Sequence, residues 1–373
     1  MPSATLTDRE RHLERFHATR SGREKPGRYW KIDLEAVKIP SDAKPGGSVS
    51  IDAPSSVIAV DMQVALRDHA AALARVAGVA TEPQHKFAHL TAAFAGLGAL
   101  IHLPADRAID EPIVVTYRAQ GAGTLFPHTV VLAERGARAT VIERIETGDG
   151  AFVCGVSEIV TEEHADITYA AVQTLPLDAR SFFTRAAKPG INARIAWATA
   201  DIGAGLAVCD IATAIEHPGI EANVASLFFP TGTQHVDIVS TVDHRAGHST
   251  SQTLVKSAAN GRGQARYLGN IRIAAHAQGS EAGLRDDALL LSKQAHIDSI
   301  PALEIAANDV KAFHGATVGA IDDEQLFYMT SRGIDRQQAE RMIALGFFEP
   351  VIDRFPTQTL RDELHDALPN KVL

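Results

Sequence analysis

The chain of 373 residues contains only two cysteines, Cys154 and Cys209, and this scarcity excludes several kinds of site. Two cysteines cannot form the disulfide framework of a small secreted domain, nor supply the four thiolates of a structural zinc site. Both lie in apolar runs of β-type residues, AFVCGVSEIV and GLAVCDIATAI. These surroundings favour small, buried and unreactive thiols.

The chain also lacks the motifs of several enzyme classes and of membrane proteins. It has no GxxxxGK[ST] phosphate loop, no GxSxG elbow and no HExxH motif. No segment offers the roughly 18–20 apolar residues of a bilayer span, and the charged start MPSATLTDRERHLERFHATR is unlike a signal peptide. The net charge of −9 argues against general nucleic-acid binding. We therefore expect a cytoplasmic protein that binds neither membranes nor nucleic acids.

Short runs of β-branched residues fill the middle of the chain, from Ile101 onwards. A similar turn followed by alternating residues begins at Gly136, His164, Gly190 and Gly219, with spacings of 28, 26 and 29 residues. Repeats of a few tens of residues, each forming one strand-rich coil, indicate a solenoid. Asn-Gly and Asp-Gly hairpin turns are almost absent, which favours a right-handed parallel β-helix over a sandwich.

Helical patterns flank this body on both sides. Before it, we expect helices over 5–20, 61–78 and 84–98. The chain is thus expected to divide into an N-terminal helical region (1–100), a β-helix core (101–320) and a C-terminal helical region (321–373). The edges of a β-helix must be covered against pairing, by these helices or by a partner.

The C-terminal region shows clear helix signals. Asp322 or Asp323 is expected to cap a helix that ends at Gly333. A second helix is expected from Asp335 to Gly346, and a third stretch over 348–367, interrupted or kinked at Pro356.

Histidine is unusually frequent, with 16 residues. His244 and His248 have the spacing of a metal pair, but the run DHRAGHS resembles a turn, which does not align two rings as a helix would. We interpret them as turn-stabilising residues, with His244 bonded to Asp243 or to a Ser or Thr of an adjacent coil.

His314 has a different setting, in a Gly-flanked segment between the apolar run Leu303-Glu304-Ile305 and the C-terminal helices. A neutral imidazole at this position is suited to ligate iron or to relay protons. Glu304 and Asp309 are the nearby acidic candidates. Because Glu304 interrupts an apolar run, it is either a solvent-facing strand residue or a paired functional carboxylate.

Residues 289–334, LLLSKQAHIDSIPALEIAANDVKAFHGATVGAIDDEQLFYMTSRGI, resemble the C-terminal core of the SufB/SufD family of iron–sulfur cluster assembly proteins. The run Thr241-Val242-Asp243-His244 and the later Gly346-Phe347-Phe348 add to the resemblance. The chain resembles the SufD type, because no cysteine follows Cys209 whereas the SufB type carries one before the acidic strand motif. Ala312 stands where SufD proteins often have a cysteine, which leaves His314 as the matching functional residue.

The resemblance implies a right-handed β-helix that pairs with a SufB-like subunit, and C-terminal helices that bind a SufC-like ATPase. An ATPase partner agrees with the missing phosphate loop. It also implies that iron enters, and the cluster forms, at the interface between the SufB and SufD subunits. We expect no cofactor stably bound to the isolated chain, and transient iron or an iron–sulfur cluster in the complex.

On this basis His314 is the candidate cluster or iron ligand at the SufB interface, with Glu304 as a second candidate metal ligand. Asp323, Phe327 and Arg332 are candidate docking residues for the ATPase. We expect a homodimer in isolation, because a surface meant for SufB can self-pair with two-fold symmetry.

The expected role is a non-enzymatic scaffold subunit, and two alternatives remain open. One is a purely structural SufD-like protein without a ligand role, which the alanine at position 312 favours. The other is a carbohydrate-active β-helix enzyme, such as a polysaccharide lyase or an esterase. Such enzymes line one face with paired carboxylates, whereas the acidic residues here do not recur at coil spacing.

Overall fold

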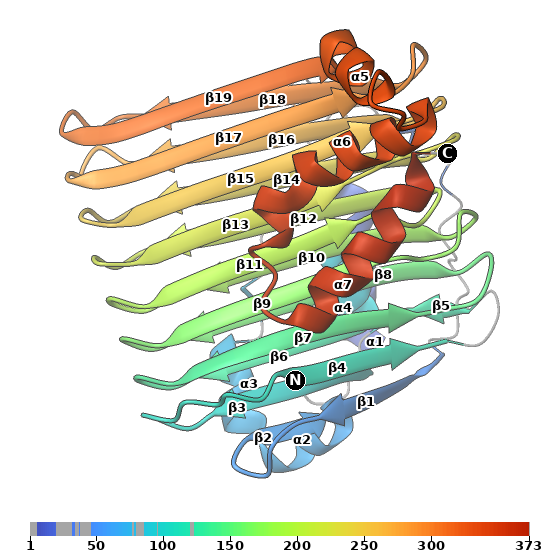
Figure 1. Ribbon diagram of the computed structural model, residues 1–373. Helices are drawn as coiled ribbons and strands as arrows, with labels where there is room; N and C mark the ends of the chain where they lie inside the picture. Colours follow the sequence, from blue (N-terminus) through green and yellow to red (C-terminus); the bar gives the residue numbers. More distant parts are fainter. Residues whose placement is uncertain are drawn as a thin grey trace.

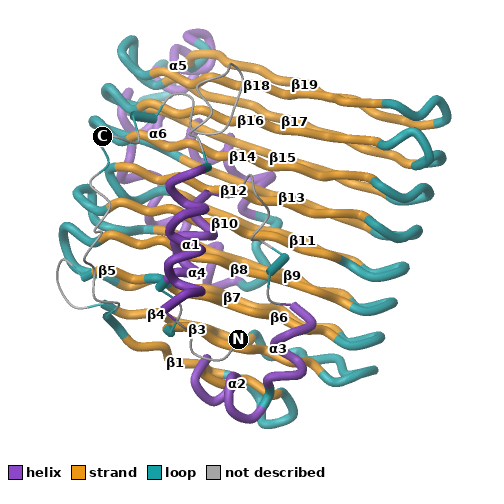
Figure 2. The backbone as a smooth tube through the Cα atoms, turned by 180° about the vertical axis from the view of Figure 1, so that it is seen from behind, coloured by secondary structure: helices purple, strands orange, loops and turns teal. Residues whose placement is uncertain are grey.

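A computed structural model describes residues 6–19, 32–33, 37, 46–76, 78–79, 86–94, 96–119 and 123–372. Two long parallel sheets wind into a β-solenoid, and helices pack on its outside (Figure 1 and Figure 2). From β3 onwards the chain alternates between the sheets, so that each pair from β3–β4 to β18–β19 forms one coil. The predicted parallel β-helix is therefore confirmed.

Each sheet follows the order of the coils. The nine-stranded sheet contains β1 (Ser48–Asp52), β4 (Ile113–Arg118), β7 (Arg138–Glu146), β9 (Asp166–Gln173), β11 (Arg194–Asp201), β13 (Glu221–Phe228), β15 (Thr250–Ala259), β17 (Ser280–Leu290) and β19 (Val310–Ala320). The ten-stranded sheet contains β2 (Ile58–Asp61), β3 (Leu97–Leu103), β6 (Pro127–Ala133), β8 (Phe152–Thr161), β10 (Arg180–Lys188), β12 (Leu206–Ile215), β14 (His235–His244), β16 (Gln264–Ile273) and β18 (His296–Ile305), with β5 (Thr124–Leu125) beside β8. Among the described strands, only β1 and β2, at the start, pair antiparallel with their neighbours.

The interior, formed by every second residue of both sheets, is largely apolar. Equivalent residues of successive coils stack in register, as Val141, Tyr169, Trp197 and Val224 do along the nine-stranded sheet. The rings of Tyr169 and Trp197 lie 5.3 Å apart in an edge-to-face arrangement. This stacking explains why the strands tolerate near-continuous apolar sequence.

From β3–β4 to β16–β17, one corner of each coil is a turn with left-handed backbone. Positive φ angles recur there at Asp106, Gly136, His164, Asn192, Gly219, His248 and Gly279. The intervals from Gly136 through His164 and Asn192 to Gly219 are 28, 28 and 27 residues. The third repeat is therefore centred on Asn192, and its assignment to Gly190 was wrong by two positions, because asparagine also adopts the left-handed conformation.

The helices cover the outer faces of the two sheets. On the ten-stranded sheet lie α1 (Leu6–Ala18), α2 (Met62–Asp68), α3 (Ala70–Val76) and α4 (Lys86–Ala93) (Figure 2). On the nine-stranded sheet lie α6 (Arg336–Ile352), α7 (Gln358–Ala367) and the short helix η1 (Leu368–Lys371), preceded along the chain by α5 (Asp323–Thr330) (Figure 1). Among the described residues, no helix is both long enough and apolar enough to cross a membrane.

Several predicted boundaries differ from the structure. The stretch expected to be helical before residue 101 also contains β1, β2 and the start of β3, and the helix expected over 61–78 is split at His69. The helix expected to stop at Gly346 continues to Ile352, because Phe348, Val351 and Ile352 are fully buried against the nine-stranded sheet. Pro356 lies between α6 and α7 and interrupts the helical stretch as predicted.

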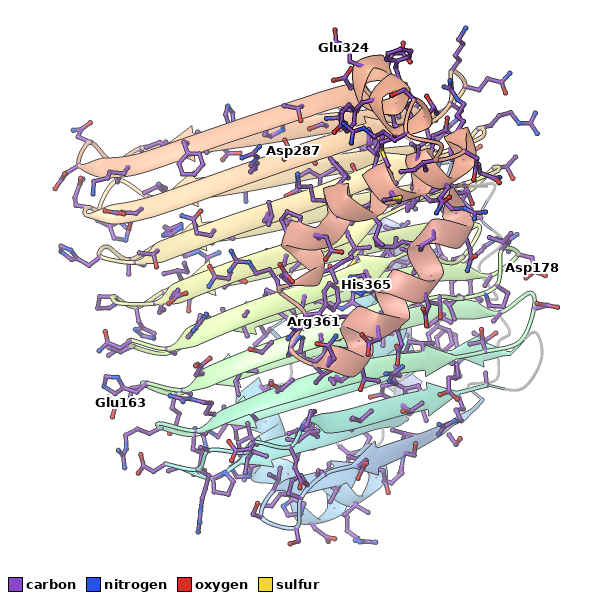
Figure 3. The ribbon with its side chains drawn as sticks, viewed as in Figure 1. Glu163, Asp178, Asp287, Glu324, Arg361 and His365 are labelled. Carbon is purple, nitrogen blue, oxygen red and sulfur yellow. The ribbon has the colours of Figure 1, made fainter. Side chains whose placement is uncertain are left out.

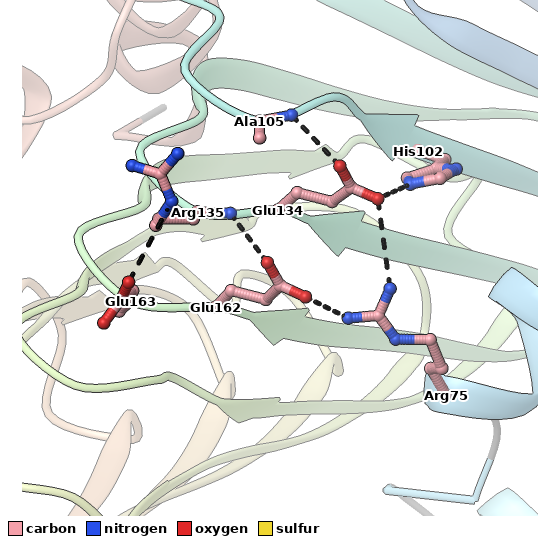
Figure 4. A network of polar contacts seen from close by, with 7 residues as sticks. All are labelled: Arg75, His102, Ala105, Glu134, Arg135, Glu162 and Glu163. Atoms are coloured by element: carbon pink, nitrogen blue, oxygen red, sulfur yellow. Dashed lines mark hydrogen bonds and ion pairs between the residues drawn. The ribbon is translucent and has the colours of Figure 1, made fainter.

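A polar network fixes α3 to the edge of the first coils (Figure 4). Glu134 and Glu162 occupy equivalent turn positions on successive coils, and the Arg75 guanidinium of α3 contacts both carboxylates. Glu134 also contacts His102 Nε2 at 2.9 Å and accepts a bond from the Ala105 N–H at 3.1 Å. The bond to His102 lowers the pKa of Glu134. These contacts hold one end of the solenoid against its helical cover.

Candidate functional site at the open end of the solenoid

The two ends of the solenoid differ. At the first end, antiparallel β1 and β2 close the sheets and α2 lies beside them (Figure 1). At the other end, β18 and β19 are the last strands of their sheets, and no described strand pairs with their outer edges. Residues of β19 are exposed at almost every position, whereas the residues paired with them on β17 are mostly buried. The final coil is therefore an uncovered sheet end.

Apolar side chains gather around this end. Of the eight large apolar side chains that the described residues expose, six lie between residues 305 and 342. These six are Ile305, Phe313, Val318, Phe327, Tyr328 and Met342. Three of them belong to β18 and β19, and three to α5 and α6. An apolar, unpaired strand edge of this kind usually marks a contact with another chain.

His314 lies in the middle of β19, on the row of residues that faces the solenoid interior. It pairs in register with Leu284 of β17, which is buried in the core. Because β19 has no next coil above it, His314 is exposed. Among the described residues, no hydrogen bond or ion pair involves its ring. The imidazole is thus free to meet a ligand or a partner at the open end.

Glu304 does not accompany His314. It lies on the outer row of β18, where strand alternation turns it away from the interior, and its carboxylate contacts Arg272 Nε at 3.2 Å. Its side chain is 62% exposed. Of the two interpretations of Glu304 from the sequence, the solvent-facing strand residue fits this position. Asp309 is exposed in the turn before β19.

Two aspartates that do not belong to the predicted site lie beneath the open end. Asp286 of β17 points inward and is fully buried, and Ser299 of β18 donates a hydrogen bond to its Oδ2. Burial raises the pKa of Asp286 to about 6. Its other oxygen, Oδ1, is buried and has no hydrogen-bond partner among the described residues. The signal for this pair was the doublet Asp286-Asp287 within the apolar run GLRDDALLLS.

Asp287 faces outward and joins several elements (Figure 3). It accepts bonds from Lys256 Nζ at 2.8 Å, the Thr317 hydroxyl at 2.7 Å and Arg285 Nε at 2.9 Å. Burial raises its pKa, but these bonds outweigh burial and leave the pKa of Asp287 below its ordinary value. Lys256 Nζ also lies 4.5 Å from the ring centroid of Phe347. Asp287 therefore connects β15, β17 and β19 with α6.

Helix α5 stands at the same end as β19, where Figure 3 labels Glu324 in its first turn. Asp322 is its N-cap and accepts the Glu324 N–H at 2.8 Å. Asp323 and Phe327, four residues apart, share one face of the helix, and Phe327 is 74% exposed. The Arg332 guanidinium lies 4.6 Å from the ring centroid of Tyr328. The three candidate docking residues thus lie on an exposed, partly aromatic surface.

The remaining candidates have structural roles. Cys154 and Cys209 are buried as predicted, and burial raises the pKa of each thiol to about 12. His244 is buried, and its two ring nitrogens lie 2.8 Å from the hydroxyls of Ser249 and Ser251. It is bonded to serines as predicted, but these belong to its own coil and not to an adjacent one. His248 lies exposed in a left-handed corner turn. Among the described residues, no group of three or more His, Cys, Asp or Glu side chains could hold a metal.

Comparison with known proteins gives these features their context. The model of the family described as "SUF system FeS cluster assembly, SufBD core domain" matches residues 115–347. The chain belongs to the SufBD family. The matched region runs from β4 through the open end into α6, so it includes His314 and the surface of α5.

Curated relatives carry the same family names. The iron-sulfur cluster assembly protein SufD of Bacillus subtilis is 27% identical over 325 residues, which cover 85% of this chain and 74% of that protein. A SufBD family protein of Staphylococcus epidermidis is 25% identical over 286 residues, covering 76% of this chain and 62% of that protein. The likeness to a SufD protein agrees with the SufD type expected from the sequence.

The buried His244 generates a test of stability against pH. Burial lowers its folded-state pKa from 6.5 to about 4, so the unfolded chain binds the proton first as the pH falls. The stability that neutral His244 contributes is present above pH 6.5 and is lost between pH 6.5 and about 4, by an amount on the order of 3 kcal/mol.

We expect His244→Gln to lower the free energy of unfolding at pH 7.5 and to flatten its decline between pH 6.5 and 4. Urea unfolding across this pH range measures both effects, and His314→Ala is the control that should keep the wild-type slope. An unchanged slope in His244→Gln would contradict a buried neutral histidine.

Proposed function

We propose that this chain is a scaffold subunit of an iron–sulfur cluster assembly complex, which pairs with a SufB-type subunit and binds a SufC-type ATPase. Family membership supports the proposed process, and the exposed end of the solenoid supports the place proposed for pairing. The observation that supports the proposal most directly is an unpaired, apolar strand edge that carries an unbonded histidine on its inner row. The protein acts as a scaffold, and the transferred iron or cluster is its cargo.

Pairing with the SufB-type subunit is proposed to occur at β18 and β19. No described strand pairs with the outer edges of these two strands, so a strand of another chain can pair with them. β19 is 11 residues long, and Phe313 and Val318 remain 58% and 47% exposed on it. A second copy of this chain offers the same edge, so we propose that the isolated chain forms a two-fold homodimer through it.

The ATPase is proposed to dock on α5 and the adjoining start of α6. Phe327 and Tyr328 supply an apolar surface, and Asp323 and Arg332 supply charges of both signs beside it. Interface cores are enriched in aromatic residues and arginine in this way. Because this chain has no phosphate loop, the nucleotide is bound by the partner.

His314 is proposed to be a ligand of the iron or of the nascent cluster at the seam between the two subunits. Imidazole is a suitable ligand for iron, and the ring is exposed where the partner would lie. The residues of this chain form only part of such a site, since the described residues contain no cluster of three or more ligating side chains. The remaining ligands, including any thiolate, come from the partner in this proposal.

Complex formation tests the two surfaces separately. Co-expression with a SufB-type subunit and a SufC-type ATPase should yield a stable ternary complex. Val318→Lys should weaken the affinity for the SufB-type subunit at least about tenfold, because an unpaired ammonium group would be buried at the seam. Ile191→Lys, at an exposed apolar position on a distant corner, is the matched control and should pair normally.

Phe327→Asp should release the ATPase and retain the SufB-type subunit, while Leu177→Asp, at another exposed apolar position, should retain both partners. Co-purification followed by size-exclusion chromatography measures these outcomes. A wild-type chain that stays free under co-expression would contradict the proposal.

The ligand role of His314 separates this proposal from a purely structural SufD-like role. In cells that depend on the complex, His314→Ala should leave its assembly intact and lower the activity of an iron–sulfur reporter enzyme about tenfold. His296→Ala, which removes an exposed histidine of β18 paired with Asp298 at 2.9 Å, should leave the reporter unchanged. Normal maturation with His314→Ala would favour the structural role, and turnover of acidic polysaccharides by the pure chain would favour an enzyme.

A further inference from the structure

The buried carboxyl group of Asp286 is not explained by packing. Its Oδ2 accepts the Ser299 hydroxyl, but its Oδ1 is buried without a hydrogen-bond partner among the described residues. Its side chain is 0% exposed. A buried carboxyl oxygen without a partner destabilises a fold, so such groups usually have a functional reason.

The strand register places Asp286 next to His314. On β17, Leu284 and Asp286 are consecutive residues of the inner row, and their partners on β19 are His314 and Ala316. His314 and Asp286 are therefore diagonal neighbours that point to the same side of the sheet, with Cα atoms about 8 Å apart. At that separation, a carboxylate and an imidazole can both reach one ion between them.

The residue of β19 that lies directly over Asp286 has a small side chain. Ala316 is its direct partner on β19 and is exposed, because no further coil lies above it. The inner row of β19 thus places only a methyl group directly over Asp286.

We propose that Asp286 and His314 together form this chain's half of a divalent-metal site at the open end of the solenoid. The inference rests on the proposed function, and it identifies the acidic ligand that would act with His314. A carboxylate oxygen with an imidazole nitrogen suits ferrous iron and similar divalent ions. The Oδ1 atom is the ligand, while the Ser299 hydroxyl orients the carboxyl group through Oδ2, as hydrogen bonds to metal ligands do.

The neighbouring carboxylates do not fit this role. Glu304 lies on the outer row of the other sheet and is paired with Arg272. Asp287 faces the opposite side from Asp286 and is bonded to Lys256, Thr317 and Arg285. Glu304 therefore offers a matched control, because it is an acidic residue of the same coil with no path to His314.

The test is a titration of the isolated full-length chain with Co²⁺ alone, followed by calorimetry and by the visible absorption of the ion. The wild-type chain should bind one Co²⁺ per chain saturably, with the absorption bands of nitrogen and oxygen ligation. Asp286→Asn and His314→Ala should each weaken this binding at least about tenfold, since loss of even an outer-shell group costs that much. Glu304→Gln should bind as the wild type does.

The melting temperature of each variant at pH 7.5 shows whether a loss of Co²⁺ binding comes from a folding defect. Asp286→Asn keeps an acceptor for Ser299 and removes a buried charge, so its melting temperature should equal or exceed that of the wild type. Wild-type affinity in Asp286→Asn, equal losses in Glu304→Gln, or no saturable Co²⁺ binding by the wild-type chain would each overturn the inference.

Co-purification with the SufB-type subunit separates failure of this inference from failure of the proposed function. If the partners assemble but Asp286→Asn binds Co²⁺ normally, only the inference fails. If Asp286→Asn and His314→Ala lose Co²⁺ but no partner assembles, the metal half-site stands and the proposed function fails.

Discussion

The fold depends on one constraint: the backbone groups along each strand edge need hydrogen-bond partners. Within the solenoid, each coil satisfies the backbone groups of the coil before it, from β3–β4 up to the last pair. The antiparallel strands β1 and β2 close the first end. At the far end the described chain supplies no further strand, so β18 and β19 present open edges together with exposed apolar side chains. Most of the large apolar side chains that the described residues expose lie at this far end and not at the first, which makes the far end suited to another subunit.

The position of the helices strengthens this view. The ends of the β-helix were expected to be covered either by helices or by a partner chain. Most of the helices instead lie on the outer faces of the sheets. α6 and α7 bury Phe348, Val351 and Leu364 against the nine-stranded sheet, and α5 projects at the open end. Asp287 and Lys256 connect α6 with β19 through hydrogen bonds and the ring of Phe347. The last part of α6 is thus joined to the strand of the proposed seam by direct contacts.

The sequence predicted the class of fold well, because β-branched runs separated by small turns repeat once per coil. Its errors were local. The repeat pattern misses Asn192 as a turn residue, since a glycine lies two positions before it. The helix predicted to end at Gly346 continues, because the residues after it are buried. Burial by distant strands cannot be read from a local pattern.

The candidate site was predictable only in part. His314 stood out through its surroundings and through the family resemblance, and its exposure follows from its place on the last strand. Its acidic neighbour was not predictable, because Glu304 is close in sequence but turns to the other face, whereas Asp286 lies 28 residues away and becomes adjacent through coil register. Only the three-dimensional stacking of coils brings that pair together.

Hydrogen–deuterium exchange on the chain, alone and with the SufB-type subunit, tests the central claim most directly, because the claim concerns backbone groups at one edge. On binding, the amides of β19 from Val310 to Ala320 should become strongly protected, while those of α5 should change only when the ATPase is added. Unchanged exchange along β19 in a stable complex would show that the subunits meet elsewhere and would contradict the account.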